Sequence, residues 1–150
     1  MNYLSDLEGI MNRYLKEGRN WNPHLENTRD FILECIRSCR CKTVTILGSG
    51  WLLDVPSDEL NDLCDKIIFV DIYHPPQIRH RMKKYQKTEF VTRDITGGTV
   101  KEVYNLVQEF RKNGVKRPVS EIAVPGFKPD FNTGYMVSLN ILNQLDILII

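Results

Sequence analysis

Short runs of β-branched and other apolar residues constrain the fold of this chain more than any other feature. They occupy residues 43–47 (TVTIL), 66–70 (KIIFV) and 89–92 (EFVT), and 135–139 (YMVSL) is a fourth candidate. The runs are nearly continuous in apolar residues instead of alternating with polar ones. This pattern is typical of strands in a sheet that is covered on both faces, and such sheets are parallel. We therefore predict a parallel sheet.

Helical patterns fill the intervals between the runs. One helix begins at Ser57, with acidic residues in its first turn, and apolar residues at helical spacing mark another over 78–85. A third begins with a capping box at Thr99 and ends at 113–114. Residues 115–134 contain three prolines and two glycines and indicate a long loop. The alternation of strands and helices predicts an α/β fold with right-handed crossovers.

The residues before the first strand indicate two helices. A capping box at Ser5 begins the first helix, and Gly18 ends it. The second begins at Asn22, because asparagine is a good N-cap and the proline that follows is tolerated in a first turn. We therefore divide the chain into an N-terminal helical segment, residues 1–42, and a sheet-containing domain, residues 43–150.

The composition is that of an ordinary soluble protein. Hydrophobic residues make up 42% of the chain, charged residues make up 26%, and the formal net charge is +1. Such a small net charge selects neither a nucleic acid nor a membrane, and a solvated helix face explains the basic residues of 79–87. No apolar stretch approaches the roughly 18 residues of a membrane-spanning helix, and the N-terminus lacks a signal-peptide pattern. We expect a cytoplasmic protein without a membrane or nucleic-acid partner.

The cysteines do not match the spacing of a zinc ribbon. Cys35 and Cys39 share one face of a helix and Cys41 follows closely, but no histidine or fourth cysteine completes a ligand set. We interpret these residues and Cys64 as small apolar residues in the core of a reduced protein, and we expect no metal.

Three polar features follow the first three runs, where the strands end. They are the turn 48–50 (Gly-Ser-Gly), Asp71 and Asp94. In open parallel sheets, ligands bind beyond the carboxyl ends of the strands. Glycines allow a sharp turn and a close approach to a ligand, and a carboxylate can accept hydrogen bonds from ribose hydroxyls or from the amine of an adenine. Taken singly, each feature can also be a simple turn or a helix cap.

In this order and spacing, the features resemble the class I S-adenosylmethionine-dependent methyltransferases over residues 43–145. ILGSG corresponds to the glycine motif of that family, FVD to the acidic strand end that holds the ribose, and TRDIT to the adenine side. YMVSLNIL resembles the fourth strand and the residues that face the methyl group. The combination of GSGxxxDVP, VDxxHP and SLNxLxQL is similar to a bacterial methyltransferase-like subgroup of unassigned substrate.

The resemblance implies a Rossmann-like sheet between two helical layers (α/β/α) and transfer of a methyl group to an unknown acceptor. It also implies a set of residues that bind S-adenosylmethionine, with Asn140 as the candidate near the reacting centre. The cofactor-binding residues are Gly48, Ser49, Gly50, Asp71, Ile72, Asp94 and Ile95. Trp21 and His24 can cover the cofactor as a lid, and we interpret His74 as a turn residue.

A Rossmann-type dinucleotide-binding oxidoreductase is the main alternative. Its fingerprint needs a third glycine for helix–strand packing and a helix aimed at the pyrophosphate. Leu53 stands where that glycine would be, and Pro56 delays the next helix. S-adenosylmethionine has no phosphate and needs neither feature, so we favour the methyltransferase interpretation.

The end of the chain indicates that the natural protein continues. It stops at the apolar run LDILII, whereas the methyltransferase fold normally has three more strands. We therefore expect a fragment that lacks the last strands of the fold. In such a fragment the fourth strand is an exposed edge that invites self-association, so a degenerate fold serving as a non-catalytic interaction module is a third interpretation.

Overall fold

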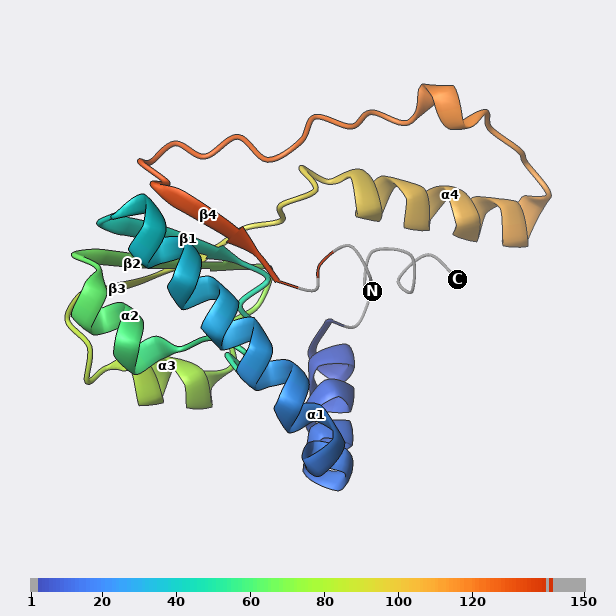
Figure 1. The fold of residues 1–150 in the computed structure, drawn as a ribbon. Helices are drawn as coiled ribbons and strands as arrows, with labels where there is room; N and C mark the ends of the chain where they lie inside the picture. The colour runs from blue at the N-terminus through green and yellow to red at the C-terminus, as the bar shows by residue number, and fades with distance from the viewer. Residues whose placement is uncertain (1–2, 140, 142–150) are drawn as a thin grey trace.

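The computed structural model describes residues 3–139 and 141, and its centre is one four-stranded parallel sheet (Figure 1). The spatial order is β3-β2-β1-β4. The strands are β1 (Thr43–Leu47), β2 (Lys66–Asp71), β3 (Thr88–Thr92) and β4 (Tyr135–Ser138). The α/β class and the parallel sheet are thus confirmed, and the predicted strands differ from these bounds by at most one residue at either end.

Within the part of the chain that the structure describes, four α-helices accompany the sheet. They are α1 (Tyr3–Cys39), α2 (Ser57–Leu63), α3 (Pro76–Met82) and α4 (Thr99–Asn113), and a short 3₁₀ turn, η1 (Val119–Glu121), follows α4. α2 and α4 begin at the predicted residues. The order of elements along the chain is that of successive β-α-β units, which explains why every strand pair is parallel.

The sequence predicts two separate helices before β1, but the structure has one helix there, α1. Its helical angles are interrupted at Glu17, where φ is −123° and ψ is 15°, next to the predicted stop at Gly18. The helix then resumes at once, so the predicted start at Asn22 is wrong. Pro23 lies inside the second part, where it removes one backbone hydrogen bond without ending the helix. α1 is therefore one bent element with two arms (Figure 1).

The main hydrophobic core lies on one face of the sheet. The strands contribute alternate residues, which include Ile46 and Phe69, and the second arm of α1 contributes Ile32 and Ile36. Apolar residues of α2 and α3 belong to the same cluster. These helices therefore form one layer against the sheet.

α4 does not lie along the opposite face as a second layer. Val100, in its first turn, is its buried residue, and in Figure 1 the helix extends beyond the sheet, beside the chain that returns to β4. That returning chain contacts the sheet where the Thr45 hydroxyl donates to the Thr133 carbonyl over 2.7 Å.

The structure corrects part of the interpretation of the cysteines. Cys39 and Cys41 form a disulfide between the end of α1 and the start of β1, and Cys39 is exposed. They are therefore neither reduced nor core residues. Cys64 is a buried free thiol, as expected, and burial raises its pKa. Within residues 3–139 and 141, no group of three or more potential ligands can hold a metal, and no helix is long and apolar enough to span a membrane.

Candidate functional site

A cavity of about 910 Å³ lies at the carboxyl ends of β1, β2 and β4, beneath α1. Its wall contains the glycine turn 48–50, Asp71 and Ile72 after β2, and Leu139 after β4. Both arms of α1 contribute the remaining side. The volume is within the usual range for small-molecule and cofactor sites. The cavity therefore brings together most of the residues that the sequence singles out.

The two glycines of the turn are required by its backbone. Their φ angles are +72° at Gly48 and +43° at Gly50, in the left-handed region that disfavours other residues. A β-carbon on Gly48 would lie 2.5 Å from the Ile141 side chain and 3.0 Å from the Leu139 carbonyl oxygen. Gly48 is thus needed for the close approach of the chain that follows β4.

The backbone N–H groups of this turn are largely used within the protein. Gly48 donates to a carbonyl of β2 over 2.9 Å, and Gly50 donates to Asp71 Oδ2 over 2.8 Å. Leu52 donates to the Ser49 carbonyl over 2.8 Å and closes the turn. A phosphate bound at a glycine-rich turn needs such donors. Here three of them already have acceptors, and one of those acceptors is a carboxylate.

Asp71 is held at the tip of β2 and remains part of the cavity wall. Beside the bond from Gly50, its Oδ1 accepts a long hydrogen bond of 3.4 Å from the Tyr73 N–H. A carboxylate offers about four acceptor positions. Asp71 can therefore accept further hydrogen bonds, such as those of a vicinal diol, while it stays anchored to the turn.

The extended loop after the glycines clamps α1 over the cavity. The Trp51 indole N–H donates to the Leu7 carbonyl in the first arm over 2.7 Å, and Arg29 in the second arm donates to the Leu53 carbonyl. α2 begins only at Ser57, so its N-terminus does not directly follow the glycine turn. The loop therefore joins the glycine turn to both arms of the bent helix.

Both arms of α1 give the cavity a polar, aromatic side. The predicted lid residues Trp21 and His24 both line it, as do Asp6 and Arg13. Tyr3 also lines the cavity, and burial, followed by the nearby charges of Asp94 and Asp6, raises the pKa of its hydroxyl.

Asp94 and Ile95 do not line this cavity. Asp94 Oδ1 accepts from the Thr96 N–H (2.8 Å) and hydroxyl (2.7 Å), and Oδ2 accepts from the Gly98 N–H over 3.1 Å. The carboxylate thus organises the turn that leads into α4, which is the turn-forming role that an aspartate at a strand end can have; the N-cap of α4 is Gly98, and no side-chain hydrogen bond caps the helix. The catalytic candidate Asn140 lies outside the described residues.

His74 lies in the loop between β2 and α3, in keeping with the predicted turn, and its side chain is buried. The side chain is 4% exposed, and its ring packs edge-on against Phe90 with the centroids 4.9 Å apart. Nε2 lies 3.1 Å from the Val91 carbonyl oxygen, and Nδ1 lies 3.5 Å from the Ser49 hydroxyl. Burial lowers the pKa of the imidazole. No sequence motif shows this pairing, because the two residues are 25 positions apart.

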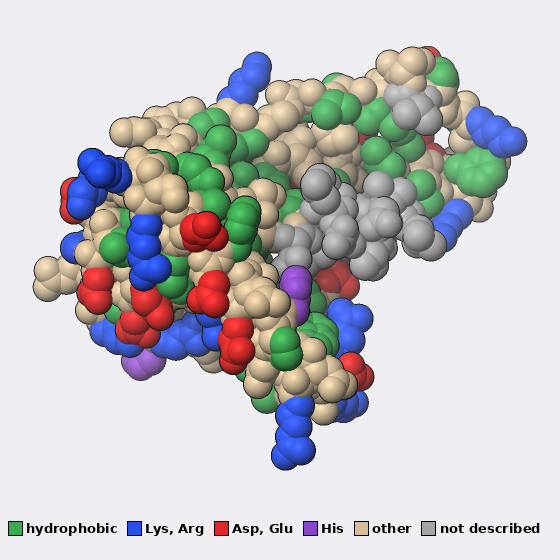
Figure 2. All heavy atoms as spheres, viewed as in Figure 1, with side chains coloured by type: hydrophobic (Ala, Val, Ile, Leu, Met, Phe, Trp, Pro, Cys, Tyr) green, Lys and Arg blue, Asp and Glu red, His purple; other side chains and the backbone are tan. Residues whose placement is uncertain are grey.

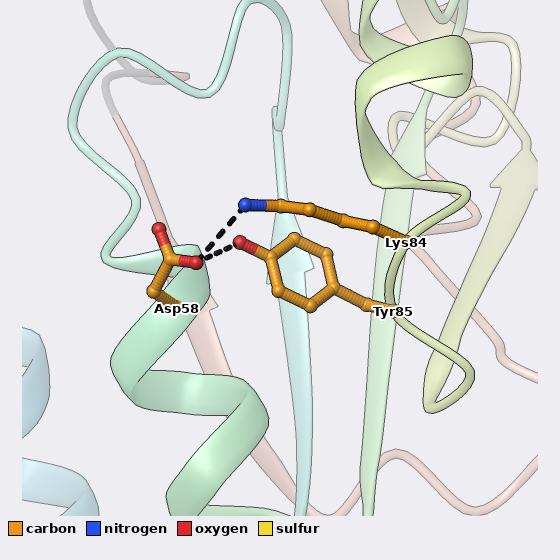
Figure 3. Close-up of polar contacts among 3 residues, drawn as sticks. All are labelled: Asp58, Lys84 and Tyr85. Atoms are coloured by element: carbon orange, nitrogen blue, oxygen red, sulfur yellow. Dashed lines mark hydrogen bonds and ion pairs between the residues drawn. The ribbon is translucent and has the colours of Figure 1, made fainter.

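A second, open cavity of about 690 Å³ lies on the outer side of His74, where Arg79, His80 and Lys83 contribute to its wall. These three side chains are exposed, in keeping with the predicted solvated face. Nearby, Lys84 and Tyr85 both bond to Asp58 of α2 (Figure 3), and these bonds lower the pKa of Asp58. On the face seen in Figure 2, acidic and basic side chains are interspersed over the helical layer.

No protein-family model, curated protein or solved structure matches this chain at a significant level. The resemblance to methyltransferases therefore depends on the residues of the chain and on the site that they form.

Proposed function

We propose that this chain binds S-adenosylmethionine and is a class I methyltransferase-like protein that transfers a methyl group to an acceptor still to be identified. One observation carries the proposal: the glycine turn 48–50 and the carboxylate of Asp71 meet in the wall of one cavity, at the carboxyl ends of adjacent parallel strands. The proposal includes a cytoplasmic location. It also includes a three-layer Rossmann-like arrangement, with helices on both faces of the sheet.

The residues present fit parts of this cofactor. Asp71 retains acceptor positions for the ribose hydroxyls, and Ile72 offers an apolar contact beside it. The turn at Gly48 and Gly50 borders the space for the methionine part. S-adenosylmethionine, when bound, supplies a methyl group on a sulfonium, and the contribution of the protein is to position it and the acceptor.

The adenine side is the least complete part of the site. Asp94 and Ile95 lie outside the cavity wall, and the Asp94 carboxylate already accepts three hydrogen bonds. In the proposal, these two residues border the adenine end of the cofactor. Asp71 is the stronger candidate for direct contact.

A phosphate-bearing dinucleotide fits the cavity less well. Its pyrophosphate would meet N–H groups that are already bonded, next to the negative charge of Asp71. The helix that should point at it begins late, at Ser57. These observations favour a ligand without phosphates.

Calorimetric titration of the 150-residue chain with S-adenosylmethionine and S-adenosylhomocysteine tests the proposal. We expect both to bind and Asp71→Asn to weaken binding by roughly tenfold or more, because a charged acceptor is lost. Asparagine is isosteric and can still accept from the Gly50 N–H. Asp62→Asn, an exposed change on α2, is the control. The proposal is wrong if neither ligand binds at millimolar concentration, or if Asp71→Asn binds as the unmodified chain does.

A further inference from the structure

The second cavity lies at the carboxyl ends of β2 and β3. Its wall contains Tyr73 and His74, which follow β2, Thr92 at the end of β3, and residues from one side of α3 and its C-cap. Among the residues that the structure describes, none lines both this cavity and the cavity at the glycine turn. The volume of about 690 Å³ is within the usual range for small-molecule sites. A ligand here would therefore contact a different set of residues.

The wall of this cavity carries positive charge without matching negative charge. Arg79 and Lys83 both line it, and they lie on one helical face because they are four positions apart. No aspartate or glutamate belongs to the described part of the wall. The neighbouring Lys84 pairs with Asp58, whereas neither Arg79 nor Lys83 forms an ion pair within the described part of the chain. These two cations are therefore available to an anionic ligand.

The guanidinium of Arg79 is held in place by contacts that leave most of its donors unused. Its Nη2 donates to the Thr92 hydroxyl oxygen over 3.3 Å, and its Cζ lies 5.2 Å from the centre of the Phe90 ring. A guanidinium has five N–H donors in a rigid fork, so most of them remain for a ligand. The Thr92 hydroxyl accepts from Arg79, and its own hydrogen is left to donate. The cavity therefore presents a positioned fork and a hydroxyl side by side.

This set of donors fits a phosphate group better than a carboxylate. A phosphate monoester carries a charge of about −1.5 to −2 at neutral pH and three strong acceptor oxygens. A carboxylate has a single charge and two oxygens. Two cations and a hydroxyl, supplied by α3 with its C-cap and by β3, match the charge and the three oxygens of the phosphate.

A nucleic acid fits the same surface less well. Binding to a nucleic-acid backbone needs a continuous basic track. Here acidic residues interrupt the basic ones, since Asp58 pairs with Lys84 and Glu89 pairs with Lys66. On the face seen in Figure 2, acidic and basic side chains are likewise interspersed, and the formal net charge of the chain is only +1. The positive charge is thus confined to the cavity.

We propose that the second cavity binds the phosphate group of a small phosphorylated ligand. Arg79 binds the phosphate with its guanidinium fork, Lys83 supplies the second positive charge, and Thr92 donates its hydroxyl hydrogen. This site does not depend on the proposed function, because the two cavities have separate walls. The chain then has two ligands of opposite kinds, one without phosphates at the glycine turn and one with a phosphate beside α3.

An amide NMR titration of the 150-residue chain with ribose 5-phosphate, at constant ionic strength, tests the site. We expect saturable shifts centred on residues 73–83 and 92, because these surround the cavity. Unphosphorylated ribose is the matched ligand and should cause no saturable shifts there. An absence of saturable shifts at millimolar ribose 5-phosphate, or shifts centred on residues 48–54, would overturn the proposal and leave the proposed function untouched.

Variants of α3 distinguish a binding site from general attraction between charges. Arg79→Gln and Lys83→Gln should each weaken binding roughly tenfold, because each removes a charged donor to the phosphate. Arg81→Gln is the matched control: it removes the same charge from an exposed position of α3 outside the cavity wall, and it should change the affinity less than about twofold. An equal loss in Arg81→Gln and Arg79→Gln would show diffuse attraction only and would contradict the proposal.

Two further arms complete the experiment. If Arg79→Gln does not fold, because Arg79 contacts Phe90, the exposed Lys83 still gives the comparison with Arg81. A single-stranded RNA oligomer should shift the same amides less strongly than ribose 5-phosphate does. Tighter binding of the oligomer at these residues would assign the surface to a nucleic acid, and the proposal of a small phosphorylated ligand would be wrong.

Discussion

At the scale of single residues, the two carboxylates that follow β2 and β3 have different environments. Asp71 is shared between the glycine turn and the cavity, whereas Asp94 is committed to the turn before α4. The sequence predicts that each of these aspartates follows a strand. It does not predict their different roles, because the role of each carboxylate depends on which N–H groups lie close to it in the folded chain. The burial of His74 against Ser49 was missed for the same reason.

The local role of Asp94 predicts an effect on stability. Asp94→Ala removes an acceptor for three hydrogen bonds and should lower the free energy of unfolding by about 1 kcal/mol or more, because the bonds that hold this turn are lost. Urea denaturation measures this. Asp62→Ala, an exposed control, should change the value by less than about 0.5 kcal/mol. An Asp94→Ala chain as stable as the control would show that the carboxylate does not stabilise this turn.

At the scale of elements, the strands were predictable and the placement of the helices was not. Continuous β-branched runs define β1 and β2. The capping box predicted at Thr99 is wrong, because Gly98 is the N-cap of α4 and no side-chain hydrogen bond caps this helix. The union of two predicted helices into α1 was not predictable, because the loop after the glycines holds both arms. The apolar stripe on α4 likewise does not predict which surface this helix will cover.

The clamp between this loop and α1 gives a prediction for the first arm. Trp51→Phe keeps an aromatic ring but removes the hydrogen bond to the Leu7 carbonyl, which is worth about 1 kcal/mol. Hydrogen exchange of the amides in residues 3–16 should become roughly fivefold faster. Phe31→Leu, at an exposed position of the second arm, is the comparison and should leave these amides unchanged. Equal rates in the Trp51→Phe and unmodified chains would contradict the clamp.

At the scale of the whole molecule, the sheet ends at β4 among the described residues. β4 pairs with β1 on one side, and Met136 on this strand is 50% exposed. An uncovered edge strand is a template for pairing with another chain. We therefore propose that this chain self-associates through β4.

Sedimentation velocity over a range of concentrations tests the association. The unmodified chain should sediment faster as its concentration rises, and Met136→Lys should reduce this dependence, because a charge on an edge strand opposes pairing. Leu15→Lys replaces an exposed apolar residue of α1 and should leave the association intact. A monomer at every concentration would count against the role of β4.

The central claim is that the cavity at the glycine turn binds S-adenosylmethionine, and an NMR titration of the amide groups with S-adenosylhomocysteine tests it most directly. We expect saturable shifts centred on residues 48–54 and 71–72, with weaker ones in the first arm of α1. Arg79 and Lys83, in the wall of the second cavity, should not move. An absence of shifts at millimolar ligand, or shifts centred on that second cavity, would contradict the account.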